Sequence, residues 1–192
     1  WNVNSIRARL ELLVSWLKEV KPDIVLLQEL KALEEVIPKE EIENLNYNYA
    51  IKGQKAYNGV AILSKYPISD IKYNLPTFDK DIQSIYIEGW IDFGGLGFRV
   101  ASIYAPNGNP IFSEKYNYKI KWLNAFKEYA KQLLKYEENI VLGGDYNICP
   151  SKLDVAKEEL ILEDAIYQKE VKTIYREIIN SGFIDSFRSF YP

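Results

Sequence analysis

The fold is decided by the stretch Asn139-Ile140-Val141-Leu142-Gly143-Gly144-Asp145-Tyr146-Asn147. Its apolar first half is bounded by glycine, which is typical of a strand buried on both faces. The two glycines permit a tight turn and leave room for a ligand. If the chain stays extended beyond them, Asp145 and Asn147 lie on one side and offer oxygen atoms to a hard cation. Taken by itself, the pattern is more often a strand followed by an Asx turn, so it needs support from a second site.

A second apolar run has the same construction. Ile24 to Leu27 lead through Gln28 into Glu29. A carboxylate at the end of a buried run is costly unless it has a partner. Lys31 is a candidate counter-charge, although a solvated lysine is the commoner arrangement. The two runs together predict a shared site for Glu29 and Asp145.

The composition limits the class of protein. The chain has 192 residues, 47% of them hydrophobic, so we expect one domain spanning residues 1–192. It has no apolar run of 18 residues and no leader-like start, which predicts neither a membrane span nor export. The single cysteine, Cys149, fits a reducing compartment, and we expect the cytoplasm. The net charge of −3 gives no general attraction to nucleic acid, and the absence of histidine removes the usual general base and zinc ligand.

Helices and strands alternate along the rest of the chain. Helices are predicted from Ser5 to the residue before Pro22, from Ser113 to Leu133 and around residues 171–179, with residues 31–45 compatible with a helix. Strands are predicted at residues 1–4, 47–51, 60–64, 83–93 and 98–104, with a hairpin at residues 94–97. Lys115, Lys119 and Lys121 are expected to be solvated. This order predicts an α/β layered fold with a mixed sheet.

Oxygen-bearing side chains gather at the predicted strand ends, namely Asn2, Glu29, Tyr104, Asp145 and Asn147. Such oxygens suit Mg²⁺, with Mn²⁺ as a substitute, and Mg²⁺ usually takes one or two carboxylates plus water and substrate phosphate. Phosphate chemistry is therefore the expected task. Asp145 could orient or deprotonate a water molecule, Asn147 could hold it in line with the phosphorus, and Tyr104 could donate to a phosphate oxygen.

Several ordered motifs resemble those of the exonuclease III and apurinic/apyrimidinic (AP) endonuclease family of the endonuclease/exonuclease/phosphatase superfamily. The motifs are Trp1-Asn2-Val3-Asn4-Ser5-Ile6-Arg7-Ala8-Arg9, Leu27-Gln28-Glu29, Tyr57-Asn58-Gly59-Val60-Ala61-Ile62-Leu63-Ser64, Tyr104-Ala105-Pro106-Asn107-Gly108 and Gly144-Asp145-Tyr146-Asn147. The resemblance covers essentially the whole chain. It implies a four-layer α/β sandwich, in which two mixed β-sheets pack face to face with helices outside. It also implies a metal-dependent DNA-repair hydrolase that cleaves duplex DNA 5′ to abasic sites, with 3′–5′ exonuclease activity in addition.

The resemblance gives each site residue a role. Asn2 and Glu29 match metal-site residues, and Tyr104 matches the catalytic tyrosine. Asp145 matches the aspartate that handles the nucleophilic water, and Asn147 matches the asparagine that stabilises the transition state. Asp145 and Asn147 are also expected to contribute to the metal site.

Three further residues match regions of the family that contact the DNA backbone. They are Arg7, Tyr57 and Asn58. The expected partner is double-stranded DNA with abasic sites, bound by a monomer that does not associate with membranes.

The chain also departs from the family. The family's chains continue further, with more strands in the second sheet and a late Asp-His pair, and this chain has no histidine and no methionine. We therefore expect a chain truncated at both ends, incomplete at the C-terminus and weakly active or inactive. Two alternatives stay open: a phosphatase or sphingomyelinase-like hydrolase on the same fold, or an inactive remnant. The segment from Tyr116 to Leu123 resembles the DNA-repair branch.

Overall fold

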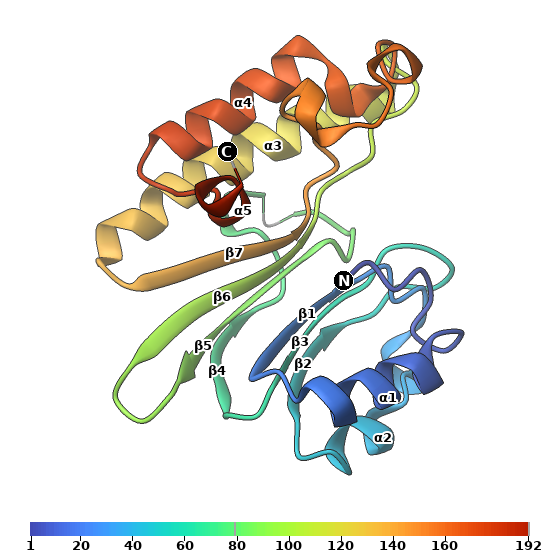
Figure 1. Cartoon of the computed structure of the whole chain (residues 1–192), viewed down its shortest axis with the longest axis vertical. Helices are drawn as coiled ribbons and strands as arrows, with labels where there is room; N and C mark the ends of the chain where they lie inside the picture. The colour runs from blue at the N-terminus through green and yellow to red at the C-terminus, as the bar shows by residue number, and fades with distance from the viewer. Residues whose placement is uncertain (79, 192) are drawn as a thin grey trace. The chain divides into compact units, whose positions relative to one another are not determined.

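The computed structural model describes residues 1–78 and 80–191 (Figure 1). The chain forms two compact units, each of which is described by itself. The first unit contains residues 1–104 and 138–146, and the second contains residues 105–137 and the segment from Asn147 onward. In the described part of the chain, every helix is too short or too polar to cross a membrane.

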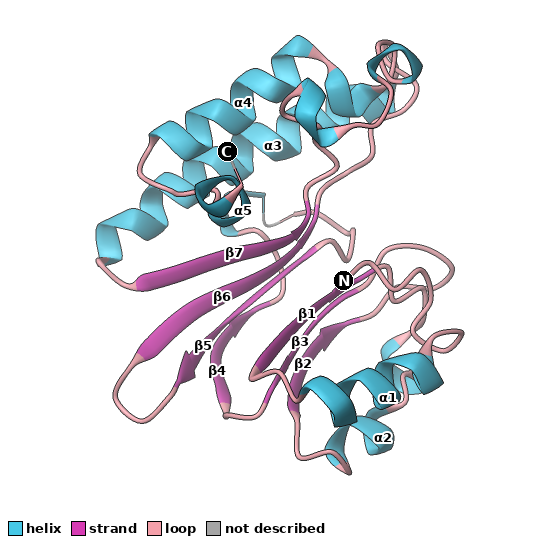
Figure 2. Ribbon diagram, viewed as in Figure 1, coloured by secondary structure: helices cyan, strands magenta, loops and turns pink. Residues whose placement is uncertain are grey.

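The first unit contains two β-sheets (Figure 2). The smaller sheet has the order β1-β3-β2 and consists of antiparallel strands β1 (Ile24–Gln28), β2 (Asn48–Lys52) and β3 (Val60–Ser64). The larger sheet has the order β4-β5-β6-β7 and consists of β4 (Ile68–Lys72), β5 (Tyr86–Asp92), β6 (Gly97–Tyr104) and β7 (Asn139–Asp145). It is a mixed sheet because β6 and β7 run parallel.

The two sheets pack face to face around a shared apolar core. Three residues of the smaller sheet and three of the larger sheet form this core: Ala50, Val60, Ile62, Ile87, Ile91 and Val100. Because side chains alternate along a strand, β1 directs Leu26 towards this core and Leu27 to the opposite face. That opposite face is covered by α1 (Leu10–Val20) and α2 (Lys39–Glu43) (Figure 1). The predicted α/β fold, with two packed sheets and helices outside, is confirmed.

The two glycines of β7 were predicted to leave room for a ligand, and this prediction is wrong. A Cβ added at Gly143 would lie 2.6 Å from the side chain of Leu26, on the facing sheet. A Cβ at Gly144, where φ is +144°, would lie 2.0 Å from the carbonyl oxygen of Ile103. The space is therefore filled by the neighbouring strand and sheet, and the glycines permit close packing.

Replacing Gly144 by alanine is expected to lower the free energy of unfolding by about 3 kcal/mol, because it adds both a backbone clash and an unfavourable φ. Urea denaturation measures this change. Gly95→Ala is the matched control, since Gly95 has φ +103° but no atom within 4 Å of an added Cβ. Equal losses in the two variants would mean that the conformational cost explains the effect and that the packing does not.

The second unit is built on helices α3 (Glu114–Leu133), α4 (Lys169–Asn180) and α5 (Ser186–Phe190). As predicted, Ser113 caps α3, where its hydroxyl accepts a hydrogen bond from the Tyr116 amide at 3.3 Å. Lys127 of α3 forms an ion pair with Glu177 of α4 at 2.7 Å, and the two helices lie side by side (Figure 1).

Candidate active site

Four of the predicted residues form one hydrogen-bonded cluster in the first unit. The side-chain nitrogen of Asn2 donates to Glu29 Oε1 at 3.0 Å and to Asp145 Oδ2 at 2.9 Å. The Tyr104 hydroxyl donates to the same Glu29 oxygen at 2.7 Å. Two carboxylates that are far apart in the sequence therefore lie within hydrogen-bond reach of a single amide nitrogen.

The strand ends place these residues together. Tyr104 and Asp145 are paired at the ends of the parallel strands β6 and β7. Asn2 forms an isolated parallel bridge with Gln28, the last residue of β1. The Gln28 side chain is buried and donates to the Ser102 hydroxyl of β6 at 3.0 Å, which joins the two sheets just before the cluster.

The backbone around Glu29 is held in an unusual conformation. Glu29 and Lys31 have φ of 57° and 51°, in the left-handed region that residues other than glycine rarely adopt. Asn4 and Ser5, on the facing segment, also have positive φ, and the Ser5 amide donates to the Glu29 carbonyl at 2.8 Å. Such strain persists only where the surroundings enforce it, and it is concentrated at functional sites. Helix α1 was predicted to begin at Ser5, but it begins at Leu10.

Lys31 belongs to this cluster, although solvent exposure was the favoured expectation. Its ammonium lies 2.7 Å from Glu29 Oε2 and donates to the Asn4 side chain. The available sequence signal was its position two residues after a carboxylate. The charged segment that follows Lys31 in the sequence nevertheless favoured solvent exposure.

The cluster changes the acidity of two of its members. Burial raises the pKa of the Glu29 carboxyl, but hydrogen bonds from Asn2, Lys31 and Tyr104, together with the Lys31 charge, outweigh burial and leave the pKa below its usual value. Burial, followed by the hydrogen bond to Glu29 and its charge, raises the pKa of Tyr104 well above its usual value. At neutral pH Glu29 is therefore an anion, and Tyr104 is a hydrogen-bond donor.

The three residues predicted to contact DNA lie on segments joined to this cluster. The carbonyl of Asn58 accepts a hydrogen bond from the Lys31 amide at 2.9 Å. Tyr57, its neighbour, is 55% exposed. Arg7 is also exposed, and it directly follows Ile6, whose amide donates to the Leu30 carbonyl at 3.1 Å.

Asn147 is placed differently from the expectation of an extended chain. Strand β7 ends at Asp145, and Asn147 has φ 48°, so the alternation of the strand does not continue to it. Asn147 belongs to the second unit, where its side-chain nitrogen donates to the Ala105 carbonyl at 2.8 Å.

Lys119, in the same unit, is fully buried, so the prediction that it is solvated is wrong.

The cluster in the first unit is chemically suited to a hard divalent cation. Its donors are oxygen atoms, and a carboxylate offers about four lone-pair sites, so the three hydrogen bonds that Glu29 accepts leave capacity for a cation. In the described part of the chain, no group of three acidic, histidine or cysteine side chains could hold a metal without other ligands. The two carboxylates therefore fit a cation such as Mg²⁺, which takes its remaining ligands from water and substrate.

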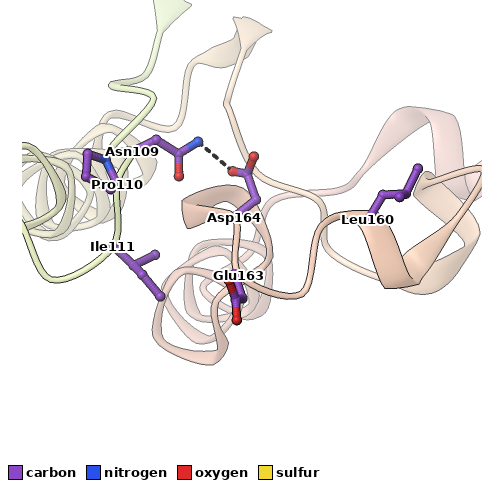
Figure 3. Close-up of a pocket in the computed structure, with 6 residues that line it drawn as sticks. All are labelled: Asn109, Pro110, Ile111, Leu160, Glu163 and Asp164. Atoms are coloured by element: carbon purple, nitrogen blue, oxygen red, sulfur yellow. Dashed lines mark hydrogen bonds between the residues drawn. The ribbon is translucent and has the colours of Figure 1, made fainter.

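A cavity of about 580 Å³ in the second unit involves none of the predicted residues (Figure 3). It is lined by Asn109, Pro110, Ile111, Leu160, Glu163 and Asp164. The Asp164 carboxylate accepts hydrogen bonds at 3.0 Å from the Asn109 side chain and from the Ile166 amide. These bonds give Asp164 a structural role in closing the loop.

Replacing Tyr104 by phenylalanine is expected to lower kcat for a phosphodiester substrate by about 10–100-fold, because Glu29 loses one of the donors that orient it. The free energy of unfolding should fall by only about 1.5–3 kcal/mol, the usual contribution of a hydrogen bond to a charged group. Single-turnover kinetics and urea denaturation measure the two effects. Tyr73→Phe, at an exposed tyrosine, is the control; wild-type kcat in Tyr104→Phe would contradict the prediction.

Comparison with known proteins gives the family of the chain. Residues 1–189 match the Endonuclease/Exonuclease/phosphatase family. The chain is 32% identical to exodeoxyribonuclease III of Haemophilus influenzae, over 100% of this chain and 74% of that protein.

Two solved structures are similar over 98% of this chain. One is an AP endonuclease from Archaeoglobus fulgidus, with a TM-score of 0.89, 33% identity and 71% of its chain covered. The other is the 3′ phosphatase NExo from Neisseria bound to a product DNA hairpin, with a TM-score of 0.91, 30% identity and 72% covered. The chain therefore belongs to the endonuclease/exonuclease/phosphatase family, in the group of hydrolases that contains exodeoxyribonuclease III and the AP endonucleases.

Proposed function

We propose that this protein is a metal-dependent DNA-repair phosphodiesterase that cleaves duplex DNA on the 5′ side of abasic sites. The observation that carries the proposal is the pair of carboxylates, Glu29 and Asp145, held on the single amide nitrogen of Asn2. Such a pair suits one Mg²⁺ ion, or Mn²⁺ in its place, with Glu29 and Asp145 as its ligands.

The orientation of Asn2 refines its own role. Its side-chain nitrogen faces the two carboxylates, and its side-chain oxygen accepts a hydrogen bond from the Asn4 amide at 3.1 Å. In this arrangement Asn2 orients the carboxylates, and ligation through its oxygen would require the amide to turn over. When bound, the cation would neutralise the phosphate and stabilise charge on the leaving oxygen.

The residues of the chain carry the other parts of the reaction. Asp145 orients a water molecule and accepts its proton as the water oxygen attacks phosphorus. As the new bond forms, the bond from phosphorus to the 3′ oxygen breaks and the 3′ oxygen takes a proton from solvent water, which leaves a 3′ hydroxyl and a 5′ phosphate. Tyr104 would donate to a phosphate oxygen, which requires its hydroxyl to turn away from Glu29, its acceptor in the structure, and the amide of Asn147 would stabilise the transition state.

Binding of DNA depends on local contacts, because the net charge of −3 provides no general attraction. Arg7, Tyr57 and Asn58 would contact the phosphate backbone beside the cluster, and the protein would act as a monomer on one duplex. Phosphate contacts of this kind position the DNA and do not read its sequence.

The experiment is incision by this protein of a labelled duplex that carries one abasic site. In Mg²⁺ we expect a single product, cut 5′ to the abasic site, and in excess chelator we expect no cleavage. Equal incision in chelator would contradict the proposed mechanism. Hydrolysis of sphingomyelin or an inositol phosphate, with intact abasic DNA, would favour another branch of the superfamily.

A second candidate activity acts at DNA 3′ ends. It is favoured by the similarity to the Neisseria 3′ phosphatase and to exodeoxyribonuclease III. A duplex with a nick and a 3′ phosphate, assayed beside the abasic duplex, measures release of phosphate and nucleotides. The ratio of the rates on the two substrates gives the balance between end trimming and incision.

A further inference from the structure

One lysine in the second unit is fully buried, although lysine side chains are usually exposed to solvent. Lys119 lies on α3 and is 0% exposed. Its ammonium donates to the carbonyl oxygen of Asn147 at 2.6 Å and to that of Pro106 at 2.8 Å. A buried ammonium is costly unless hydrogen-bond acceptors replace its water, so these contacts are required for its burial.

The loop after β6 is shaped around the Lys119 side chain. A Cβ added at Gly108 would lie 2.5 Å from Lys119 Cδ and 3.1 Å from its Cβ. Gly108 also has φ +88°, which favours glycine. This glycine therefore gives the lysine the volume that it needs to reach both carbonyl groups.

Asn147 is fixed at two points by this arrangement. Lys119 holds its carbonyl, and Ala105 accepts a hydrogen bond from its side-chain nitrogen at 2.8 Å. The backbone of Asn147 is in the left-handed region, with φ 48°, and such a conformation needs support from its surroundings. One ammonium thus joins α3, the loop after β6 and the loop that carries Asn147.

We propose that Lys119 is a positioning residue for the phosphodiesterase reaction, and that it acts by holding the backbone of Asn147. The inference rests on the proposed function, because it requires Asn147 to stabilise the transition state. In this role Lys119 contacts neither the DNA nor the cation. The Lys119 ammonium binds the Asn147 carbonyl inside the protein, and this contact fixes the position of Asn147.

Substitution tests this role through a mutant cycle. Lys119→Met keeps the stem and removes the charge, and we expect kcat for abasic-site incision to fall by about 10–100-fold with KM nearly unchanged, as for a displaced catalytic group. The matched control is Lys121→Met, at an exposed lysine on the same helix, which should retain wild-type kcat. In an Asn147→Ala background, Lys119→Met should cause no further loss. Wild-type kcat in Lys119→Met, or losses that multiply in the double variant, would overturn the proposal.

If Lys119→Met does not fold, Lys119→Arg replaces it in the same cycle, with the same criteria. Arg keeps the charge but replaces the compact ammonium by a planar group. A loss of kcat that disappears in the Asn147→Ala background supports positioning, and any other result overturns it.

Hydrogen exchange separates this inference from the proposed function. Peptides that cover residues 105–108 and 146–149 should exchange faster in the folded Lys119 variant than in wild type, and at wild-type rates in Lys121→Met. Unchanged exchange would overturn the positioning role whatever the activity. If exchange rises but Asn147→Ala keeps full kcat, the contact exists and the proposed role of Asn147 fails.

Discussion

Asp145→Asn is expected to lower kcat for abasic-site incision by about 10²–10⁴-fold, the usual contribution of a general base. Asparagine keeps the size of the side chain and can still accept the hydrogen bond that Asn2 donates, so the fold should persist. What it loses is the negative charge that binds the cation and accepts a proton from water. Single-turnover kinetics at saturating protein measures the effect, without a contribution from DNA binding.

Asp23→Asn is the matched control, because the Asp23 carboxylate forms an exposed ion pair with Lys65 on the surface. It should incise at the wild-type rate. If Asp145→Asn retained more than a tenth of wild-type kcat, Asp145 would not be the base, and the proposed assignment of roles would have to be abandoned.

Glu29→Gln is expected to weaken Mn²⁺ binding by more than about 100-fold. Loss of a residue that only supports a metal ligand lowers metal affinity by about 10–100-fold, and Glu29 is proposed to be a direct ligand. The lowered pKa of Glu29 means that wild type presents a full negative charge at neutral pH, which the amide cannot supply. Incision should fall in parallel at low Mg²⁺ and recover in part at high Mg²⁺. Titration calorimetry and the Mg²⁺ dependence of kcat measure the two effects.

Glu35→Gln, at an exposed glutamate beyond the cluster, is the control and should bind Mn²⁺ as wild type does. Wild-type affinity for Mn²⁺ in Glu29→Gln would show that the cation binds elsewhere. Recovery at high Mg²⁺ distinguishes a lost ligand from a misfolded site, since a misfolded site does not respond to cation concentration.

Local sequence patterns predicted the elements that are buried or capped. Residues 60–64 were predicted as a strand with the bounds that β3 has, because a short apolar run buried on all sides has few other solutions. The cap at Ser113 was predicted since a serine before an apolar helical pattern is a local signal. Strand β4 was not predicted, because it is half-exposed and irregular in its pairing with β5.

Features that depend on distant segments could not be read from the sequence. Lys119 was expected to be exposed, whereas the carbonyl groups of Pro106 and Asn147 accept hydrogen bonds from its buried ammonium. The glycines of β7 suggested a ligand site, whereas Leu26 and Ile103 occupy the space beside them. In each case the deciding contact comes from a residue far away in the sequence, which local periodicity does not describe.

Glu29 and Asp145 are proposed to share one divalent cation. Anomalous scattering from Mn²⁺ in crystals of the full-length protein tests it most directly, because the metal is located without reference to activity. We expect a strong peak within coordination distance of the Glu29 carboxylate and beside Asp145. A well-occupied peak elsewhere in the molecule, with none at these two carboxylates, would contradict it.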